Sequence, residues 1–163
     1  MPSFDLVSKL DMGEMKNVVN MAQKQISGRY DFKGSNTSID FKGEEALEIK
    51  ASDDYKMTAA LDILRQNMAK RNVGMRSIDP QDIEPSGNQM FKQTILIKAG
   101  IDKEQGKKIN KAIKESGIKV TSSYLDEKVR VQGKKIDDLQ AVFQYLKSHK
   151  DVVVDLQMEN MKR

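Results

Sequence analysis

Residues 119–146 read KVTSSYLDEKVRVQGKKIDDLQAVFQYL, and the fold can be worked out from this stretch outward. Short runs of alternating apolar and polar residues at 119–124 and 128–131 flank a turn at 125–127, which predicts a β-hairpin. Apolar residues then recur at the spacing of a helix, at Leu139, Val142, Phe143 and Leu146. A hairpin followed by a helix forms the second half of a β-α-β-β-α-β unit.

The flanking sequence completes this unit. Residues 90–98 predict a strand, and Asp102 is a good N-cap for a helix that leads into the hairpin. Asp137 and Asp138 are expected to cap the helix after the hairpin. Residues 152–158 predict the last strand.

The first half of the chain repeats the same order of elements. Its predicted elements are a strand at 4–9, a helix beginning after Asp11, a hairpin of 38–42 and 46–51, a helix beginning at Asp53 or Asp54, and an extended segment at 75–83. Pro80 either breaks this last segment or places it at the edge of a sheet. The sequence therefore predicts an α+β protein made of two tandem ferredoxin-like sandwiches, at residues 1–87 and 88–163. Each sandwich has two helices on one face of an antiparallel sheet.

Composition narrows the function classes. The 163 residues include no Cys and one His, which excludes disulfides, thiolate metal sites, cysteine nucleophiles and any site that needs two imidazoles. The sequence shows no pairing of nucleophile and base and no metal-ligand cluster, so we expect neither an enzyme nor a cofactor. With no membrane-length apolar run and no signal-peptide pattern, we expect a cytoplasmic protein without a membrane partner.

The formal net charge of +4 is unevenly distributed. Residues 1–87 carry 12 Lys/Arg and 14 Asp/Glu, whereas residues 88–163 carry 16 and 10. A basic second half favours a local anionic partner, either a nucleotide or a nucleic acid. Solvated lysine-rich helix faces explain the same imbalance without any ligand.

The connector at residues 29–35 (RYDFKGS) is one candidate ligand site. Its cations suit a phosphate, its carboxylate can accept hydrogen bonds from a guanine edge, its aromatic rings can stack on a base, and its small residues let backbone N–H groups approach an anion. These candidate residues are Arg29, Asp31, Phe32, Lys33, Gly34 and Ser35, with Tyr30 as the second aromatic. A purely structural turn fits equally well, with Arg29 paired to Asp31 and Phe32 anchored in the core. In that case Gly34 supplies a positive φ.

A second candidate ligand site follows the hairpin of the second half. Arg130 should project opposite to Val129 and Val131, onto the open face of the sheet, where it suits an anion. Lys134 and Lys135 follow at the turn into the last helix. An edge-strand charge followed by an ordinary capped turn is the alternative interpretation.

A basic helix face is the third candidate. The predicted helix after Asp102 carries five lysines on one side, namely Lys103, Lys107, Lys108, Lys111 and Lys114. Such a face would attract an RNA backbone, with binding that weakens in salt, but it can also be merely solvated. Strands 46–51 and 128–132 carry no aromatic residues, so we do not expect the surface of an RNA recognition motif.

Three stretches of the sequence together resemble the YajQ-type family of nucleotide-binding proteins. They are MPSFD at 1–5, RYDFKGS at 29–35 and VRVQGKKIDDLQ at 129–140, and the resemblance covers essentially the whole chain. It implies a bacterial cytoplasmic protein of two ferredoxin-like domains whose first strands, residues 2–9 and 90–98, are exchanged between the sheets. It also implies binding of a guanine nucleotide, cyclic di-GMP or RNA, and no enzyme reaction.

These observations lead to one main expectation and two alternatives. We expect a nucleotide-binding protein without catalytic activity, with a regulatory role. The alternatives are an RNA-binding accessory protein that uses the lysine face, and an interaction module for another protein.

Overall fold

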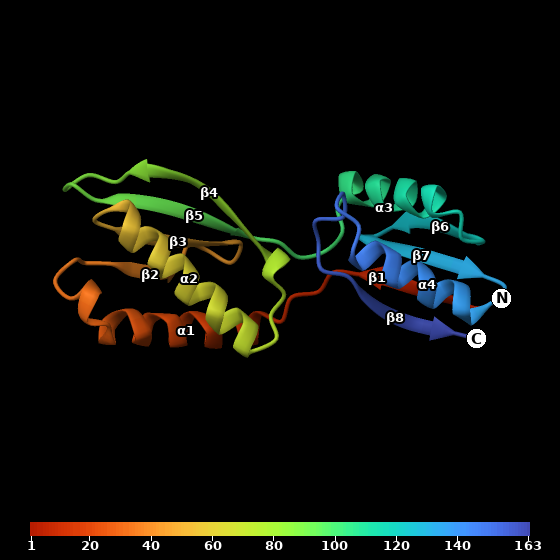
Figure 1. The fold of residues 1–163 in the computed structure, drawn as a ribbon, viewed down its shortest axis with the longest axis horizontal. Coiled ribbons are helices and arrows are strands. Elements are labelled where there is room, and N and C mark those ends of the chain that lie inside the picture. Colours follow the sequence, from red (N-terminus) through yellow and green to blue (C-terminus); the bar gives the residue numbers. More distant parts are fainter. The chain divides into compact units, whose positions relative to one another are not determined.

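The computed structural model describes residues 1–163 and divides into two compact units. The continuous unit is Leu10–Lys98, and the split unit combines Met1–Lys9 with Ala99–Arg163. The chain therefore passes from one unit to the other twice. Figure 1 colours the ribbon by sequence, so the red N-terminal strand can be found among the blue elements of the split unit. None of the helices has the length and apolar character needed to span a membrane.

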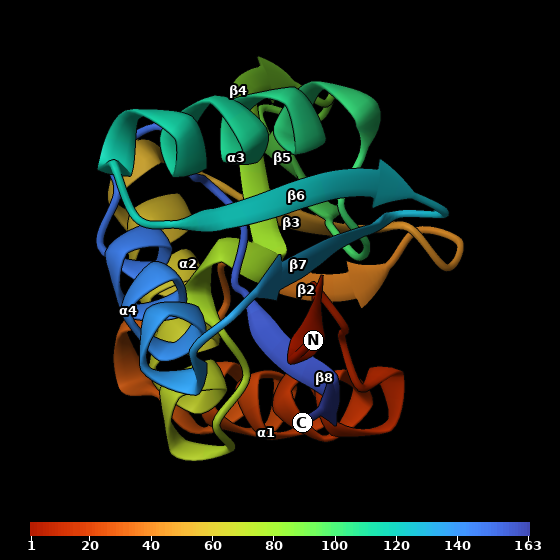
Figure 2. The same ribbon diagram turned by 90° about the vertical axis from the view of Figure 1, so that its right-hand side faces the viewer.

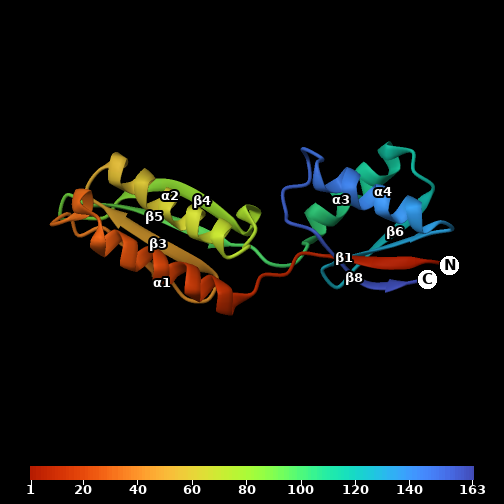
Figure 3. The same cartoon turned by 60° about the horizontal axis from the view of Figure 1, so that its bottom comes forward.

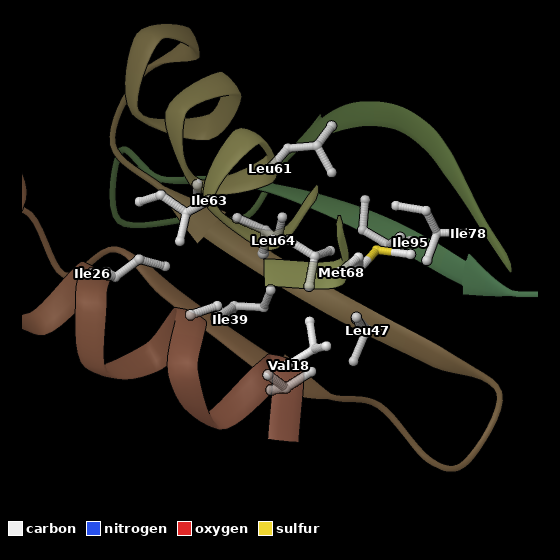
Figure 4. Close-up of a cluster of buried hydrophobic side chains, with 14 of the residues drawn as sticks. Val18, Ile26, Ile39, Leu47, Leu61, Ile63, Leu64, Met68, Ile78 and Ile95 are labelled. Atoms are coloured by element: carbon white, nitrogen blue, oxygen red, sulfur yellow. The ribbon is translucent and has the colours of Figure 1, made fainter. Parts of the chain in front are cut away.

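The continuous unit is a four-stranded antiparallel sheet covered by two helices. Its strands lie in the order β2-β3-β5-β4. Its elements are α1 (Met12–Gly28), the 3-10 turn η1 (Tyr30–Phe32), β2 (Ser38–Phe41), β3 (Ala46–Ala51), α2 (Asp54–Lys70), the 3-10 turn η2 (Met75–Ser77), β4 (Ile78–Pro85) and β5 (Phe91–Ile97). Figure 4 shows the core between the helices and the sheet, where Val18 and Leu64 face Ile39, Leu47 and Ile95.

The split unit has the same architecture. Its strands lie in the order β6-β7-β1-β8, all antiparallel, as Figure 2 shows from the side of the termini. Its elements are β1 (Ser3–Val7), α3 (Lys103–Ser116), β6 (Val120–Leu125), β7 (Lys128–Gly133), α4 (Ile136–Lys147) and β8 (Gln157–Lys162). Figure 3 shows both of its helices on the same side of β1 and β8.

Each sheet takes one of its two central strands from the other half of the sequence. β1 pairs with β7 and β8, and β5 pairs with β3 and β4. The α+β class, the ferredoxin-like order and the exchange of first strands are thus confirmed. The repeat boundary between residues 87 and 88 stays a prediction, because with exchanged strands a compact unit is no longer a sequence repeat.

Three of the predicted helix caps form as expected. The side chains of Asp11, Asp53 and Asp102 each accept a hydrogen bond from a backbone N–H in the first turn of the following helix. The prediction that Asp137 and Asp138 cap the last helix is wrong. Residue Lys135 occupies the N-cap position of α4 without a side-chain hydrogen bond, and the two aspartates lie inside the first turn. They still favour the helix, because acidic residues there interact well with its dipole.

The predicted strand at 152–158 is also wrong over most of its length. Val152, Val154 and Leu156 alternate as in a strand and are buried in the core of the split unit, but they join no sheet. Pairing with β1 begins only at Gln157, opposite Val7. The alternation of buried and exposed side chains therefore reflects packing against the core and not strand pairing.

The segment predicted at 75–83 is shifted, because the 3-10 turn η2 occupies its first residues and β4 follows. Pro80 lies in β4, which is an edge strand with a register shift, as expected.

The exchanged strand β1 also introduces a buried carboxylate into the split unit. The Asp5 side chain is only 4% exposed, whereas that of Arg130 is 54% exposed. Arg130 Nε donates to Asp5 Oδ1 at 2.9 Å, and Asn160 Nδ2 donates to Asp5 Oδ2 at 3.1 Å. The hydrogen bond from Arg130 is the main reason that the pKa of Asp5 lies below its ordinary value.

The strand exchange makes the stability of each unit depend on a distant part of the sequence. Leu6→Ala removes a fully buried side chain of β1 and should cost the split unit about 2–5 kcal/mol. Ile95→Ala in β5 should cost the continuous unit a similar amount. In hydrogen exchange, Leu6→Ala should accelerate amides of β7 and spare those of β3, and Ile95→Ala should do the reverse. The opposite pattern would contradict the exchange.

Asp5 should make the split unit less stable in acid. Its carboxylate form is stabilised only in the folded state, so its contribution is present above its ordinary pKa of 3.8 and is lost as the pH falls through the lower folded-state value. The difference in unfolding free energy between the wild type and Asp5→Asn should therefore be constant above about pH 5 and shrink below it. Urea unfolding followed by NMR signals of β7 measures this. A difference that stays the same down to pH 3 would refute it.

Candidate functional site

Three lysines converge at one end of the sheet of the split unit. Lys119 precedes β6, and Lys134 and Lys135 follow β7, its antiparallel neighbour. They line an open cavity of about 840 Å³, which we call the lysine hollow. Its polar lining residues are Lys119, Thr121, Gln132, Lys134, Lys135 and Asp138. This volume lies within the usual range for small-molecule sites.

Close backbone packing at Gly133 brings these lysines together. Gly133 ends β7 and is buried, and a Cβ atom there would lie 2.9 Å from Val120 Cγ1 and 3.4 Å from Leu139 Cδ2. A larger residue would therefore push the end of β7 away from β6 and α4. Because glycine permits the contact, the chain can turn at Lys134 and Lys135 from β7 into the start of α4.

The start of α4 adds further polar groups to the lysine hollow. Lys135 occupies the N-cap position without a side-chain hydrogen bond, and Asp138 lines the hollow from the first turn. Ammonium groups can bind phosphate as point charges, and helix N-termini favour anions. The carboxylates of Asp137 and Asp138 offset part of that attraction, and Asp138 can accept hydrogen bonds from a ligand.

Arg130 lies apart from the two lysines with which the sequence grouped it. It faces away from the core, as expected, but it lines a different and smaller cavity of about 270 Å³, which we call the arginine hollow. The other residues that line this cavity are Asp5, Ser123, Leu125, Asp126, Lys128 and Asn160. Part of the guanidinium is already occupied by Asp5.

The connector at 29–35 adopts the geometry of a structural turn. Arg29 donates to both oxygens of Asp31, at 3.0 Å and 2.6 Å, and its guanidinium lies 4.9 Å from the centre of the Phe32 ring. This pairing lowers the pKa of Asp31 and raises that of Arg29. Phe32 is only 4% exposed and belongs to the core of the continuous unit, so Tyr30, which is 90% exposed, is the aromatic ring that faces solvent.

The backbone groups of this connector are also partly used within the turn. The amides of Lys33 and Ser35 donate to the carbonyl groups of Tyr30 and Phe32, both at 3.1 Å. The Ser35 hydroxyl lies 2.6 Å from the Phe32 carbonyl oxygen, and Gly34 takes a φ of 76°, as the structural interpretation expected. The connector belongs to the continuous unit and the two hollows to the split unit, so we describe them as separate candidate sites.

The lysines of α3 all lie on its exposed side. The buried side of the helix consists of Gln105, Gly106, Ile109, Ala112 and Ile113. Two of the lysines have acidic partners on the same helix: Lys108 lies 3.7 Å from Glu104, and Lys111 lies 4.0 Å from Glu115. The basic face predicted from Lys103, Lys107, Lys108, Lys111 and Lys114 therefore exists, partly neutralised.

The excess charge belongs entirely to the split unit. The continuous unit holds 13 of the 28 Lys/Arg and 13 of the 24 Asp/Glu, which leaves 15 and 11, a net +4, for the split unit. Because the exchange moves β1 and β5, this division differs from that of the two sequence halves. The lysine hollow and the lysine face of α3 both lie in the unit that carries the charge.

Sequence reasoning missed the contribution of Lys119, and the reason is the turn of the hairpin. We expected a three-residue turn at 125–127, but Asp126 and Glu127 alone form it, with φ values of 51° and 61°. Two successive positive φ values are typical of a type I′ hairpin turn. With that turn, Val120 pairs with Gly133, so Lys119 comes next to Lys134. Asp126 was the signal for this register, because Asp is common at the first position of a two-residue hairpin turn.

Comparison with known proteins shows a relationship over nearly the whole chain. Residues 2–162 match the family described as "Nucleotide-binding protein YajQ-like". Among relatives called "Nucleotide-binding protein", that of Syntrophotalea carbinolica is 48% identical over 162 residues, 99% of each chain. The relative from Geotalea daltonii is 44% identical over 100% of each chain. The relative from Carboxydothermus hydrogenoformans is 45% identical over 98% of this chain and 97% of its own. The chain belongs to the YajQ-like family.

Proposed function

We propose that this protein binds a guanine nucleotide or a cyclic dinucleotide in the lysine hollow, without catalysing a reaction, and that this binding has a regulatory role. The observation that carries the proposal is the convergence of Lys119, Lys134 and Lys135 on a single cavity of about 840 Å³. The names of the relatives, which describe nucleotide binding, support it. So does the location of the whole net charge in this unit.

The polar groups of the lysine hollow match the two parts of a nucleotide. The three ammonium groups attract phosphates, and the start of α4 adds backbone N–H groups. The carboxylate of Asp138 and the side chains of Thr121 and Gln132 can exchange hydrogen bonds with a base or a ribose. A guanine offers N–H donors to a carboxylate on one edge and acceptors on the other.

The connector at 29–35 has a supporting role in this proposal. Tyr30 and Lys33 are exposed and can contact a base and a phosphate of a second ligand molecule. Arg29, Asp31, Phe32, Gly34 and Ser35 hold the shape of the turn through the contacts described above. The connector is therefore the weaker of the two candidate sites, because its strongest cation is already neutralised by Asp31.

Charge reversal in the lysine hollow should strongly weaken nucleotide binding. Each lysine–phosphate contact contributes about 1.5 kcal/mol, roughly tenfold in Kd, so Lys134→Glu with Lys135→Glu should weaken binding of GTP or cyclic di-GMP by about 100-fold. Calorimetry measures this effect. Lys150→Glu, a change at an exposed lysine of the same unit outside the hollow, is the matched control. Unchanged affinity in the double variant, or no heat from the wild type at millimolar ligand, would contradict the proposal.

A second candidate function is RNA binding by the lysine face of α3. The observation in its favour is that all five lysines are exposed on one side of the helix while its other side is buried. A stripe of ammonium groups along a helix can follow a phosphate backbone. Nucleotide binding is the better supported function, since two of the lysines on this face have acidic partners on the same helix.

RNA binding by α3 should depend steeply on salt. If Lys107 and Lys111 contact phosphates, Lys107→Glu with Lys111→Glu should reduce the slope of log K against log salt by about 1.4 for single-stranded RNA. Fluorescence anisotropy of a labelled RNA between 50 and 200 mM salt, roughly the range over which such contacts show, measures the slope. Lys16→Glu with Lys70→Glu, on exposed positions of α1 and α2, is the control. An equal effect of both pairs would refute a specific role of α3.

A further inference from the structure

The lysine hollow lies at the end of the sheet and extends onto the open face, where the arginine hollow also lies. Thr121 pairs with Gln132 across β6 and β7, and Ser123 pairs with Arg130. All four side chains point away from the helices, since Val129 and Val131 fill the core. Gln132 and Thr121 line the lysine hollow, and Arg130 and Ser123 line the arginine hollow. The two cavities are therefore next to each other, one pair of residues, about 7 Å, apart along the strands.

The guanidinium of Arg130 is held in one orientation but is only partly used. Its Nε donates to the buried Asp5, whose other oxygen is taken by Asn160. Asp5 lies in the central strand β1, where all five residues are buried, so the acceptor cannot move easily. The terminal nitrogens of Arg130 are not needed for this contact, and the side chain is 54% exposed. Four N–H donors on the two terminal nitrogens are therefore left, and one from each nitrogen can meet a planar ligand side by side.

The arginine hollow does not select for charge. Its two cations, Lys128 and Arg130, are balanced by its two carboxylates, Asp5 and Asp126. At about 270 Å³ it is also much smaller than the lysine hollow. A neutral lining that contains both donors and acceptors suits an uncharged, hydrogen-bonding ring better than a phosphate. The exposed Leu125 offers an apolar surface for such a ring.

We propose that Arg130, positioned by Asp5, determines the base specificity of the nucleotide bound in the neighbouring lysine hollow. This inference rests on the proposed function. The phosphates lie on Lys119, Lys134 and Lys135, and the base extends along β7 into the arginine hollow. A fork of two N–H donors pairs with two adjacent acceptors, which guanine presents at O6 and N7. Adenine has an amino group in place of O6, so a guanine ligand binds more tightly than the adenine equivalent.

Arg130→Lys tests this assignment, because it keeps the charge and removes the fork. Calorimetry on the full chain compares GTP, ATP and inorganic tripolyphosphate. The wild type should prefer GTP to ATP by about 5- to 150-fold, and Arg130→Lys should lose most of that preference with the affinity for tripolyphosphate unchanged. Asp5→Asn weakens the hydrogen bond that orients Arg130, so it should also reduce the ratio of the affinities for GTP and ATP. Arg65→Lys, at an exposed position of α2, should change none of the three affinities.

The possible results separate this inference from the proposed function. If tripolyphosphate and both nucleotides bind but GTP has no advantage over ATP, the role of Arg130 is overturned while the lysine hollow stands. If Arg130→Lys weakens all three ligands equally, Arg130 is a phosphate contact and the inference fails. If the wild type binds none of the three and no cyclic di-GMP either, the proposed function falls and this inference falls with it. Should Asp5→Asn unfold, the Arg130→Lys ratio alone decides.

Discussion

The insertion of β1 between β7 and β8 is the constraint on which the split unit depends. All five residues of this strand are buried, and Phe4 and Leu6 fill the core under α3 and α4. Without β1, the edge of β7 would be unpaired and β8 would have no partner in the sheet. The first residues of the chain are therefore as central to residues 99–163 as any part of that segment.

The same strand connects the fold to the candidate site. A strand that is buried on both faces normally carries apolar residues on both, but β1 places Asp5 on the face opposite the helices. A buried carboxylate needs partners, and it finds them in Arg130 of β7 and Asn160 of β8, one on each neighbouring strand. Asp5 thus ties three strands together and also orients an arginine toward solvent. One residue therefore both joins the strands and fixes the orientation of Arg130.

Much of the fold could be predicted from the sequence, because helix caps and hydrophobic periodicity are local signals. Asp11, Asp53 and Asp102 marked their helices correctly. Periodicity could not show which sheet a strand joins, and the exchange was expected only from the resemblance to a known family. It also failed at residues 152–156, where buried side chains alternate in a segment that makes no ladder. The hydrogen-bonding partners that define a strand lie elsewhere in the chain.

The candidate sites show why composition alone cannot identify a binding site. The connector at 29–35 combines arginine, lysine, aromatic rings and glycine, yet its arginine is neutralised by Asp31 and its Phe32 is buried. Lys134 and Lys135 were recognisable, but their partner Lys119 joins them only through the register set by Asp126 and Glu127. What distinguishes the lysine hollow is that its three lysines come from two separate segments of the chain and share the cavity with a single carboxylate, that of Asp138. Attraction for an anion depends on that local imbalance, which tertiary structure creates and a residue list does not contain.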